Sequence, residues 1–177
     1  MSELNRLSVD EFKEKKKMPI VVILDSIRSM NNVGSIFRTC DAFAIEKLYL
    51  CGITAQPPHK EISKTALGAT ETVCWQYANN VVEQVCELKN LGYAVYVIEQ
   101  TDFSIRLDDF EIKENEKIAI ILGNEVFGVD ERLLPLADAS IEIPQFGTKH
   151  SLNVSIAAGI VIWDLVCKSN KKLKQVK

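Results

Sequence analysis

Hydrophobic residues occur along the chain in short runs, separated by amphipathic stretches of helical length. The run Ile20–Leu24 is wholly apolar and rich in β-branched residues, as expected for a strand buried on both faces. Further strands are predicted at Lys47–Leu50, Thr72–Tyr77, Tyr93–Ile98, Lys117–Leu122 and Ser140–Ile143. Helices are predicted at Ser35–Phe43, Val81–Asn90 and Glu131–Ala137, and a long apolar helix over about Val154–Lys168. This alternation predicts an α/β domain with a mostly parallel sheet of about six strands flanked by helices.

The two ends of the chain differ from its middle. Ser8 and Glu11 have the spacing of a capping box, which predicts a short helix that Pro19 ends. We therefore divide the chain into a short N-terminal helical extension (1–19), a main domain (20–168) and a basic tail (169–177). No apolar run approaches the ~20 residues of a membrane span, and no signal peptide is expected.

Charge is distributed unevenly over the 177 residues. Hydrophobic residues make up 47% and charged residues 25%, which excludes disorder of the whole chain. The net charge is −3, but residues 168–177 hold five lysines and no acid, whereas residues 19–167 sum to −9. Such a tail either contacts a polyanion or is simply a solvated end, and charge alone favours the second interpretation.

The five cysteines are scattered and odd in number, and the chain has only two histidines. No C-x-x-C pair occurs, so neither a metal site nor a disulfide framework is expected. Most of these cysteines are expected to be small buried hydrophobes. A reducing cytoplasm is the predicted location.

Candidate chemistry lies in loops that follow strands, where open α/β sheets bind their ligands. The chain has no G-x-G-x-x-G, P-loop or G-x-S-x-G motif. After the first strand, Asn32 is a possible helix cap and Gly34 permits a close backbone approach. Arg38 either binds an anion or forms a structural salt bridge to a neighbour such as Asp41.

Two later loops also allow both a structural and a functional interpretation. In residues 122–129, two glycines flank a carboxylate and an aromatic ring, which indicates either a tight turn or a polar site that includes Asn124 and Glu125. In residues 143–155, Ser151 and Asn153 are either helix caps or functional groups on a loop fixed to a rigid helix.

Taken in order, the three loops resemble the three signature motifs of the SpoU (TrmH-like) branch of the SPOUT RNA methyltransferases. The first, N-x-G-x-x-x-R, is found at Asn32–Arg38, and the second, L-G-N-E-x-x-G-V, at Leu122–Val129. The third, I-P-x-x-G-x-x-x-S-L-N-V-S-x-A, is found at Ile143–Ala157. One motif alone would be weak, but all three at strand ends are specific, and the likeness spans roughly residues 20–167.

The resemblance implies transfer of a methyl group from S-adenosyl-L-methionine to a ribose 2′-hydroxyl of RNA. It implies an α/β fold with a C-terminal deep trefoil knot over roughly residues 98–165, and the second and third motifs would form the cofactor pocket. It also implies a homodimer with active sites at the interface. No metal is needed, because the methyl sulfonium is already activated.

The resemblance also implies roles for individual residues. Arg38 would activate the hydroxyl, and because arginine is effectively always protonated, we favour an electrostatic clamp on hydroxyl and phosphate over a general base. Asn32 would position Arg38 or the ribose, and Glu125 would organise the loops. Ser151 and Asn153 would shape the pocket and support catalysis.

Two larger sets of contacts follow from the same resemblance. The expected cofactor contacts are Glu99, Gln100, Thr101, Leu122, Gly123, Asn124, Gly128, Ile143, Gln145, Ser151 and Leu152. The expected RNA contacts are Arg38, Lys149, Lys168, Lys171, Lys172 and Lys174.

The RNA substrate is expected to be tRNA. Larger relatives carry a separate N-terminal RNA-binding domain, and only about 19 residues precede the first strand here. The catalytic surface and short basic segments would then hold the RNA, which suits tRNA better than a protein-rich ribosomal site. The alternatives are an rRNA 2′-O-methyltransferase, a non-catalytic RNA-binding or assembly factor, and an α/β small-molecule enzyme whose motif match is accidental.

Overall fold

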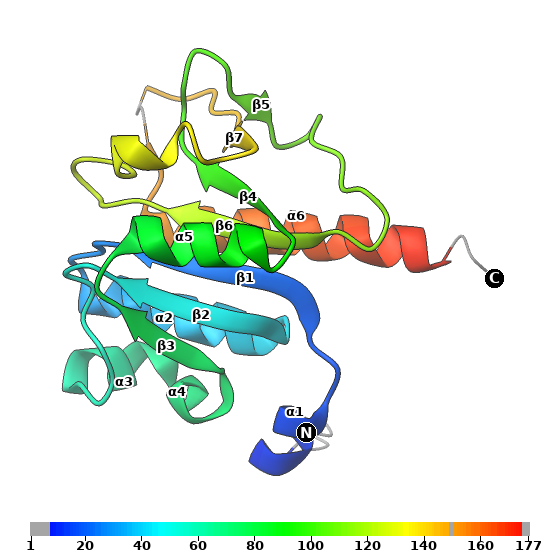
Figure 1. Cartoon of the computed structure of the whole chain (residues 1–177). Helices are drawn as coiled ribbons and strands as arrows, with labels where there is room; N and C mark the ends of the chain where they lie inside the picture. The colour runs from blue at the N-terminus through cyan, green and yellow to red at the C-terminus, as the bar shows by residue number, and fades with distance from the viewer. Residues whose placement is uncertain (1–7, 149–150, 175–177) are drawn as a thin grey trace.

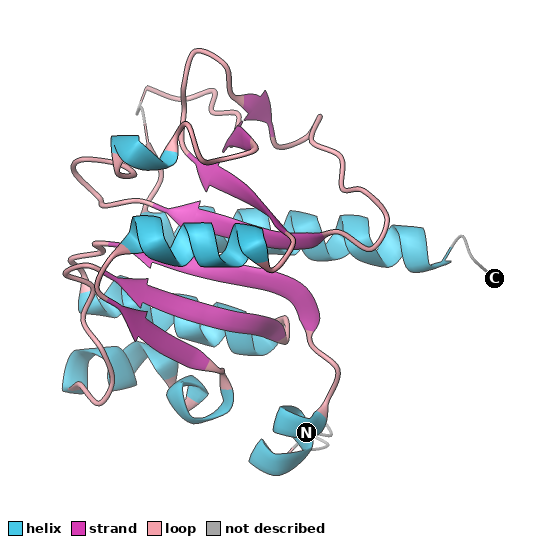
Figure 2. Ribbon diagram, viewed as in Figure 1, coloured by secondary structure: helices cyan, strands magenta, loops and turns pink. Residues whose placement is uncertain are grey.

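A single parallel sheet of seven strands organises the molecule (Figures 1 and 2). The computed structural model describes residues 8–148 and 151–174. The strand order is β3-β2-β1-β6-β4-β7-β5, and every pairing is parallel. The strands are β1 (Met18–Asp25), β2 (Ile45–Cys51), β3 (Trp75–Ala78), β4 (Tyr93–Ile98), β5 (Ile105–Arg106), β6 (Lys117–Leu122) and β7 (Ala139–Glu142).

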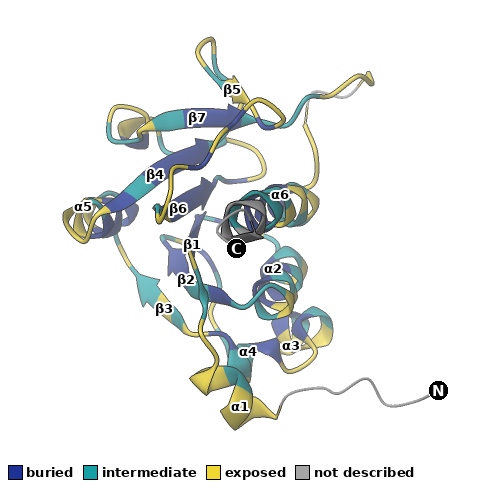
Figure 3. Ribbon diagram, turned by 90° about the vertical axis from the view of Figure 1, so that its right-hand side faces the viewer, coloured by how far each residue is buried: buried dark blue, intermediate teal, exposed yellow. Residues whose placement is uncertain are grey.

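Helices cover both faces of the sheet, so the central strands are buried on both sides (Figure 3). In β1, Ile20, Val22 and Leu24 join the core cluster that includes α2 and α6, while Val21 and Ile23 join the cluster under α5. This alternation follows from the two-residue period of a strand. The helices are α1 (Val9–Glu14), α2 (Met30–Ala42), α3 (Lys60–Ala66), α4 (Ala69–Thr72), α5 (Val81–Asn90), the 3₁₀ helix η1 (Glu131–Leu133) and α6 (Val154–Lys174).

The register of the central strands brings three strand ends to one level. Leu24 of β1 and Ile98 of β4 both pair with Leu122 of β6. The loops that follow these strands therefore leave the same edge of the sheet side by side. This edge is the one at which an α/β sheet binds its ligands.

The predicted strands are confirmed, and two of them, β4 and β6, have the predicted bounds. Strand β5 and helices α3 and α4 were not predicted, and α4 occupies the start of the third predicted strand. Helix α2 begins earlier than predicted, at Met30. Its cap is Ser29, whose Oγ accepts a hydrogen bond from the Asn32 amide (3.3 Å), so the expectation that Asn32 caps this helix is wrong.

The segment between β4 and β6 covers part of the last helix. Leu107, Phe110 and Ile112 belong to the same core cluster as Leu165 of α6. The Lys168 ammonium donates to the Leu107 carbonyl (2.6 Å) and fixes this contact. The trefoil knot expected over about residues 98–165 remains a prediction. No helix in the described part of the chain is long and apolar enough to cross a membrane.

Candidate active site

The second and third motif loops line a pocket of about 480 Å³ at the carboxyl edge of the sheet, and Asn32 of the first motif bonds to both of them there. The lining of the pocket comes from residues 98–100, 122–128, 141–145 and 151–157. All the predicted cofactor residues line it except Thr101, whose carbonyl instead accepts the Ser104 hydroxyl (2.9 Å) in a turn. The volume lies within the range of roughly 300–1,000 Å³ that is usual for small-molecule sites.

The second motif loop folds back tightly on itself. Asn124 and Gly128 exchange backbone hydrogen bonds (2.8 and 2.9 Å), and Asn124 Oδ1 accepts from the amides two and three residues later (2.9 and 3.1 Å). A Cβ on Gly123 would lie 2.3 Å from the backbone of Gly128 and Val129. Gly123 is therefore required by the turn itself, and close approach of a ligand is not needed to explain it.

Gly128 has a left-handed backbone with φ +72°, and a Cβ there would lie 2.5 Å from a Glu99 carboxylate oxygen. The strand end of β4 thus meets the second motif loop across the pocket wall. A side chain at this glycine would strain the backbone and also displace Glu99.

The turn after β1 is clamped onto the second loop by backbone and side-chain hydrogen bonds. Asn124 Nδ2 donates to the Ser26 carbonyl (2.6 Å). The amides of Arg28 and Ser29 donate to the two Glu125 carboxylate oxygens (3.0 and 3.1 Å). The turn that leads into the first motif is therefore held against the second motif before any ligand binds.

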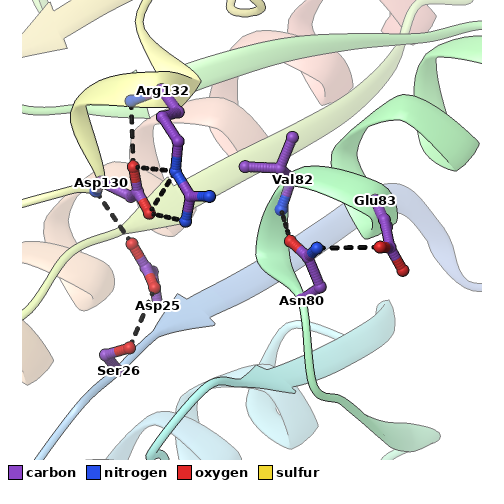
Figure 4. Close-up of polar contacts among 7 residues, drawn as sticks. All are labelled: Asp25, Ser26, Asn80, Val82, Glu83, Asp130 and Arg132. Atoms are coloured by element: carbon purple, nitrogen blue, oxygen red, sulfur yellow. Dashed lines mark hydrogen bonds and ion pairs between the residues drawn. The ribbon is translucent and has the colours of Figure 1, made fainter.

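A buried carboxylate at the end of β1 completes this clamp (Figure 4). Asp25 accepts a hydrogen bond from the Asp130 amide (2.9 Å), and burial raises its pKa although that bond opposes the shift. Asp130 in turn holds the Arg132 guanidinium, whose hydrogen bonds lower the Asp130 pKa. Sequence analysis missed Asp25. The available signal was an acid that ends a wholly apolar run.

One chain of side-chain hydrogen bonds joins all three motifs. Asn32 Nδ2 donates to Glu125 (3.1 Å), and Asn153 Nδ2 donates to Asn32 Oδ1 (3.1 Å). Asn153 Oδ1 also accepts from the Ser155 amide (2.9 Å) at the start of α6. Asn153 is therefore both a helix cap and a member of the cluster, so the two interpretations of this residue are compatible.

Glu125 is held as a carboxylate. Partial burial alone would raise its pKa, but the hydrogen bonds from the Arg28 and Ser29 amides and from Asn32 outweigh burial and lower the pKa below its usual value. The amino end of α2 adds a favourable dipole. At neutral pH, Glu125 therefore only accepts hydrogen bonds, which suits the organisation of loops and does not suit proton donation.

The glycine of the first motif serves packing between helices. A Cβ on Gly34 would lie 2.1 Å from Thr65 Oγ1 and 2.3 Å from the Ile62 carbonyl. The close approach predicted at this glycine is confirmed, and helix α3 is the approaching element.

Arg38 lies apart from the pocket. It is exposed on α2, six residues after Asn32, which corresponds to about 9 Å along the helix axis. It borders a second depression of about 450 Å³, between α2 and α3, that also includes Lys64. No acid in residues 8–148 or 151–169 pairs with it, and Asp41 accepts the Thr72 hydroxyl instead. The salt-bridge interpretation is therefore not supported.

The model of the SpoU rRNA Methylase family matches residues 19–163. The chain belongs to this family. A tRNA (guanosine(18)-2′-O)-methyltransferase of Aquifex aeolicus is 30% identical over 155 residues, which are 87% of this chain and 72% of that protein. The enzyme of the same name from Thermus thermophilus is 30% identical over 166 residues, or 92% of this chain and 82% of that protein. A 23S rRNA (guanosine-2′-O-)-methyltransferase of Neisseria meningitidis is 31% identical over 86% of this chain and 60% of its own length.

Solved structures of SpoU proteins share the fold. The A. aeolicus TrmH/SpoU tRNA modifying enzyme superposes with a TM-score of 0.82 at 27% identity, over 93% of this chain and 82% of that chain. An AdoMet-bound rRNA methyltransferase from Sinorhizobium meliloti gives a TM-score of 0.77 at 27% identity, over 90% of this chain and 60% of that chain. The predicted fold class is therefore confirmed.

Beside Arg38, this SpoU chain exposes an apolar face. Ile156, Ile160 and Trp163 follow one another at helical spacing on α6 and are 56%, 38% and 55% exposed. The Trp163 ring contacts that of Phe43, the C-cap residue of α2, with centroids 5.6 Å apart, and Phe43 also lines the depression that contains Arg38.

The lysines predicted to contact RNA have different surroundings. Lys168 is half-buried, where it pairs with Asp164 (2.6 Å) and donates to Leu107, so its ammonium is already committed to the fold. Lys64 on α3 was missed, because α3 itself was not predicted. Lys149, Lys171, Lys172 and Lys174 lie outside the residues whose side chains the structure describes.

Proposed function

We propose that this SpoU chain transfers the methyl group of S-adenosylmethionine to a ribose 2′-hydroxyl of tRNA. The observation that carries the proposal is the hydrogen-bonded cluster of Asn32, Glu125 and Asn153, which joins the three motifs beside the pocket. The tRNA-modifying relatives from A. aeolicus and T. thermophilus favour tRNA over rRNA. The rRNA enzyme of N. meningitidis makes rRNA the second candidate.

The pocket suits the methyl donor. Leu122, Ile143 and Leu152 supply apolar surface for an adenine ring, and Glu99 and Glu142 supply negative charge for a cationic ligand. Backbone groups at the strand ends offer hydrogen bonds to the rest of the molecule. The bound cofactor supplies an already activated methyl group, so the protein has only to bind it, orient the ribose and activate the hydroxyl.

Arg38 is the group that activates the hydroxyl. A ribose hydroxyl is a very weak acid, and a fixed guanidinium beside it lowers its pKa and can hold the neighbouring phosphate at the same time. Arg38 does not line the proposed cofactor pocket of its own chain and borders a separate depression instead. We therefore assign Arg38 to the cofactor pocket of a partner subunit.

A homodimer provides that partner. The face formed by Ile156, Ile160 and Trp163 is apolar, exposed and close to Phe43 at the edge of the Arg38 depression. Burying this face against a second copy would remove apolar surface from water and bring Arg38 towards the other active site. The trefoil knot belongs to the same proposal, with residues 98–165 holding the cofactor loops in place.

RNA outside the pocket is held by charge. Arg38 and Lys64 border the depression between α2 and α3, and Lys64 is also paired with Glu61 on the exposed surface of α3 (3.2 Å). The lysines of the tail, Lys171, Lys172 and Lys174, supply further positive charge. Phosphate contacts of this kind position an RNA without reading its sequence. All five cysteines are free thiols, which supports a cytoplasmic location for the enzyme. Only Cys40 and Cys51 are buried, so the expectation that most of the cysteines are buried is wrong.

The test is transfer of labelled methyl groups from S-adenosylmethionine to purified total tRNA and total rRNA, followed by mapping of the labelled nucleotide. We expect a 2′-O-methylated nucleoside in tRNA. Label confined to rRNA would replace the first candidate with the second. Binding of both RNA and cofactor with no transfer would favour the non-catalytic factor, and a methylated base would contradict the proposed chemistry.

A further inference from the structure

Two phenylalanines that adjoin residues of the pocket lining stand almost fully in solvent. Phe127 is 84% exposed and lies between Val126 and Gly128, which both line the pocket. Phe146 is 91% exposed and follows the lining residue Gln145. They belong to the second and third motif loops, so they adjoin the pocket lining on two different segments of the chain.

The backbone that carries Phe127 is fixed. Its amide donates to Asn124 Oδ1 (3.1 Å), and Asn124 is buried and bonded to Ser26. A large apolar ring held in water by a rigid turn gains nothing for folding. Exposed apolar side chains that gather beside a binding site usually mark a surface that a ligand covers.

Phe103 is equally exposed, at 92%, but it lies elsewhere along the chain. No residue within two positions of it lines the pocket. Its neighbourhood is also acidic, with Asp102 beside it and Asp108 and Asp109 a few residues later. Phe103 therefore offers a matched control of the same residue type and exposure.

We propose that Phe127 and Phe146 stack on bases of the RNA at the methylation site. This inference rests on the proposed function. A ribose whose 2′-hydroxyl enters the pocket carries its base at the adjacent carbon, so the base lies at the mouth of the pocket, near the lining residues that these rings adjoin. Phenyl rings offer flat apolar faces and no hydrogen-bonding groups, and stacking on them tolerates every base.

Stacking also defines the class of substrate. The faces of a base within a duplex are already covered by its neighbours, whereas an unpaired base in a loop can be splayed onto an aromatic side chain. The methylated nucleotide is therefore unpaired, and the pocket mouth selects for this state more than for the identity of the base.

The test compares two probes that differ only in their bases. One is a fluorescent oligoadenylate of about twelve nucleotides, near the upper site sizes known for single-strand binding. The other is an oligomer of the same length with abasic riboses. F127A/F146A should bind oligoadenylate at least about ten-fold more weakly, because the loss of even one stacked base has about that effect. It should bind the abasic oligomer like the wild type. F103A should match the wild type with both probes.

An aromatic rescue makes the test specific to stacking. F146W should retain affinity for oligoadenylate, and its additional fluorescence should be quenched when the RNA binds, whereas F146L should lose affinity although it stays apolar. Equal binding of oligoadenylate by the wild type and F127A/F146A would overturn the inference. Sedimentation of F127A/F146A as a monomer, where the wild type is a dimer, would also overturn it, because the rings would then belong to a subunit interface.

The proposed function is checked separately, by methyl transfer to total tRNA with the wild-type protein. Transfer by the wild type, combined with unchanged binding in F127A/F146A, would refute only the stacking inference. Absence of transfer together with absence of cofactor binding by the wild type would refute the proposed function itself.

Discussion

Asn32 and Arg38 belong to the same helix and the same motif, but their surroundings are opposite. Asn32 is bonded on both sides, to Glu125 and to Asn153, and stands beside the cofactor pocket. Arg38 is exposed, has no acidic partner in the described residues and borders a separate depression. The pocket is thus organised within one chain, whereas Arg38, which we propose to activate the hydroxyl, has no acidic partner among the described residues.

Substitution of Arg38 should have the largest effect on the rate of methyl transfer. Arg38→Ala should lower the rate of methyl transfer by at least about 100-fold, the usual loss when a preorganised charge is removed from a transition state. Arg38→Lys should fail as well, because lysine lacks the planar fork. Cofactor affinity by calorimetry and the melting temperature should stay unchanged, since the fold makes no use of this guanidinium. Near-normal turnover in either variant would remove Arg38 from the mechanism.

Mixed dimers test whether Arg38 acts in the pocket of its own chain or in the pocket of the partner subunit. Arg38→Ala supplies an intact pocket, and Asn153→Ala supplies an intact arginine. If Arg38 acts in the partner's pocket, each mixed dimer in a refolded equimolar mixture has one active site out of two. Random pairing makes about half of the two-fold dimers mixed, so the mixture should regain about a quarter of the wild-type rate. If Arg38 acts within its own chain, the mixture is as inactive as its components.

A substitution in the second motif loop should have the next largest effect. Gly123→Ala places a Cβ 2.3 Å from the Gly128 and Val129 backbone, so the second motif loop has to shift. We expect a loss of about 1–3 kcal/mol in the free energy of unfolding, as for other overpacked sites, and a parallel loss of cofactor affinity. Gly147→Ala on the third loop is the control, because a Cβ there meets nothing within 4 Å. Equal stability of the two variants would contradict this account of the turn.

A smaller effect concerns the charge of Glu125. Glu125→Gln should cost about 1 kcal/mol of stability at neutral pH, because the carboxylate accepts two amides and Asn32 near the protein surface. Its folded pKa is lowered, so its contribution is present above the unfolded pKa and is lost as pH falls through the folded value. Urea titrations should therefore show the difference between the two proteins shrinking in acid. A difference that grows in acid would refute the assigned direction.

The smallest effect concerns RNA affinity. Lys64 borders the Arg38 depression, whereas Lys60 on the same helix does not. Lys64→Ala should make the log–log salt dependence of tRNA binding shallower by about 0.7–0.9, the value for one phosphate contact, and Lys60→Ala should leave it unchanged. Identical slopes in both variants would exclude this depression from the RNA path.

Most of the sheet could be predicted from sequence, because its central strands are buried on both faces and are continuous apolar runs, as in residues 118–122 of β6. Strand β5 could not be predicted, because Ile105–Arg106 is short and exposed and has no pattern. Helix α3 was missed because its cap is the His59 ring nitrogen, which accepts the Glu61 amide.

The sequence predicted which residues form the candidate site better than it predicted the hydrogen bonds between them. The motif residues other than Arg38 lie together as expected. The cap of α2 was expected at Asn32 but is Ser29, which leaves the Asn32 side chain free to reach Glu125. The position of Asp25 beneath the second loop depends on which strands are neighbours in the sheet, and local pattern contains no such information.

The side chain of Asn153 uses both ends of one amide group. Its oxygen caps α6, and its nitrogen holds Asn32, which in turn holds Glu125 on the cofactor loop. The first turn of α6 cannot rotate or slide without breaking these bonds or moving Asn32 with it. A displacement of the first turn of α6 would therefore either break one of these bonds or move Asn32 and Glu125 with it.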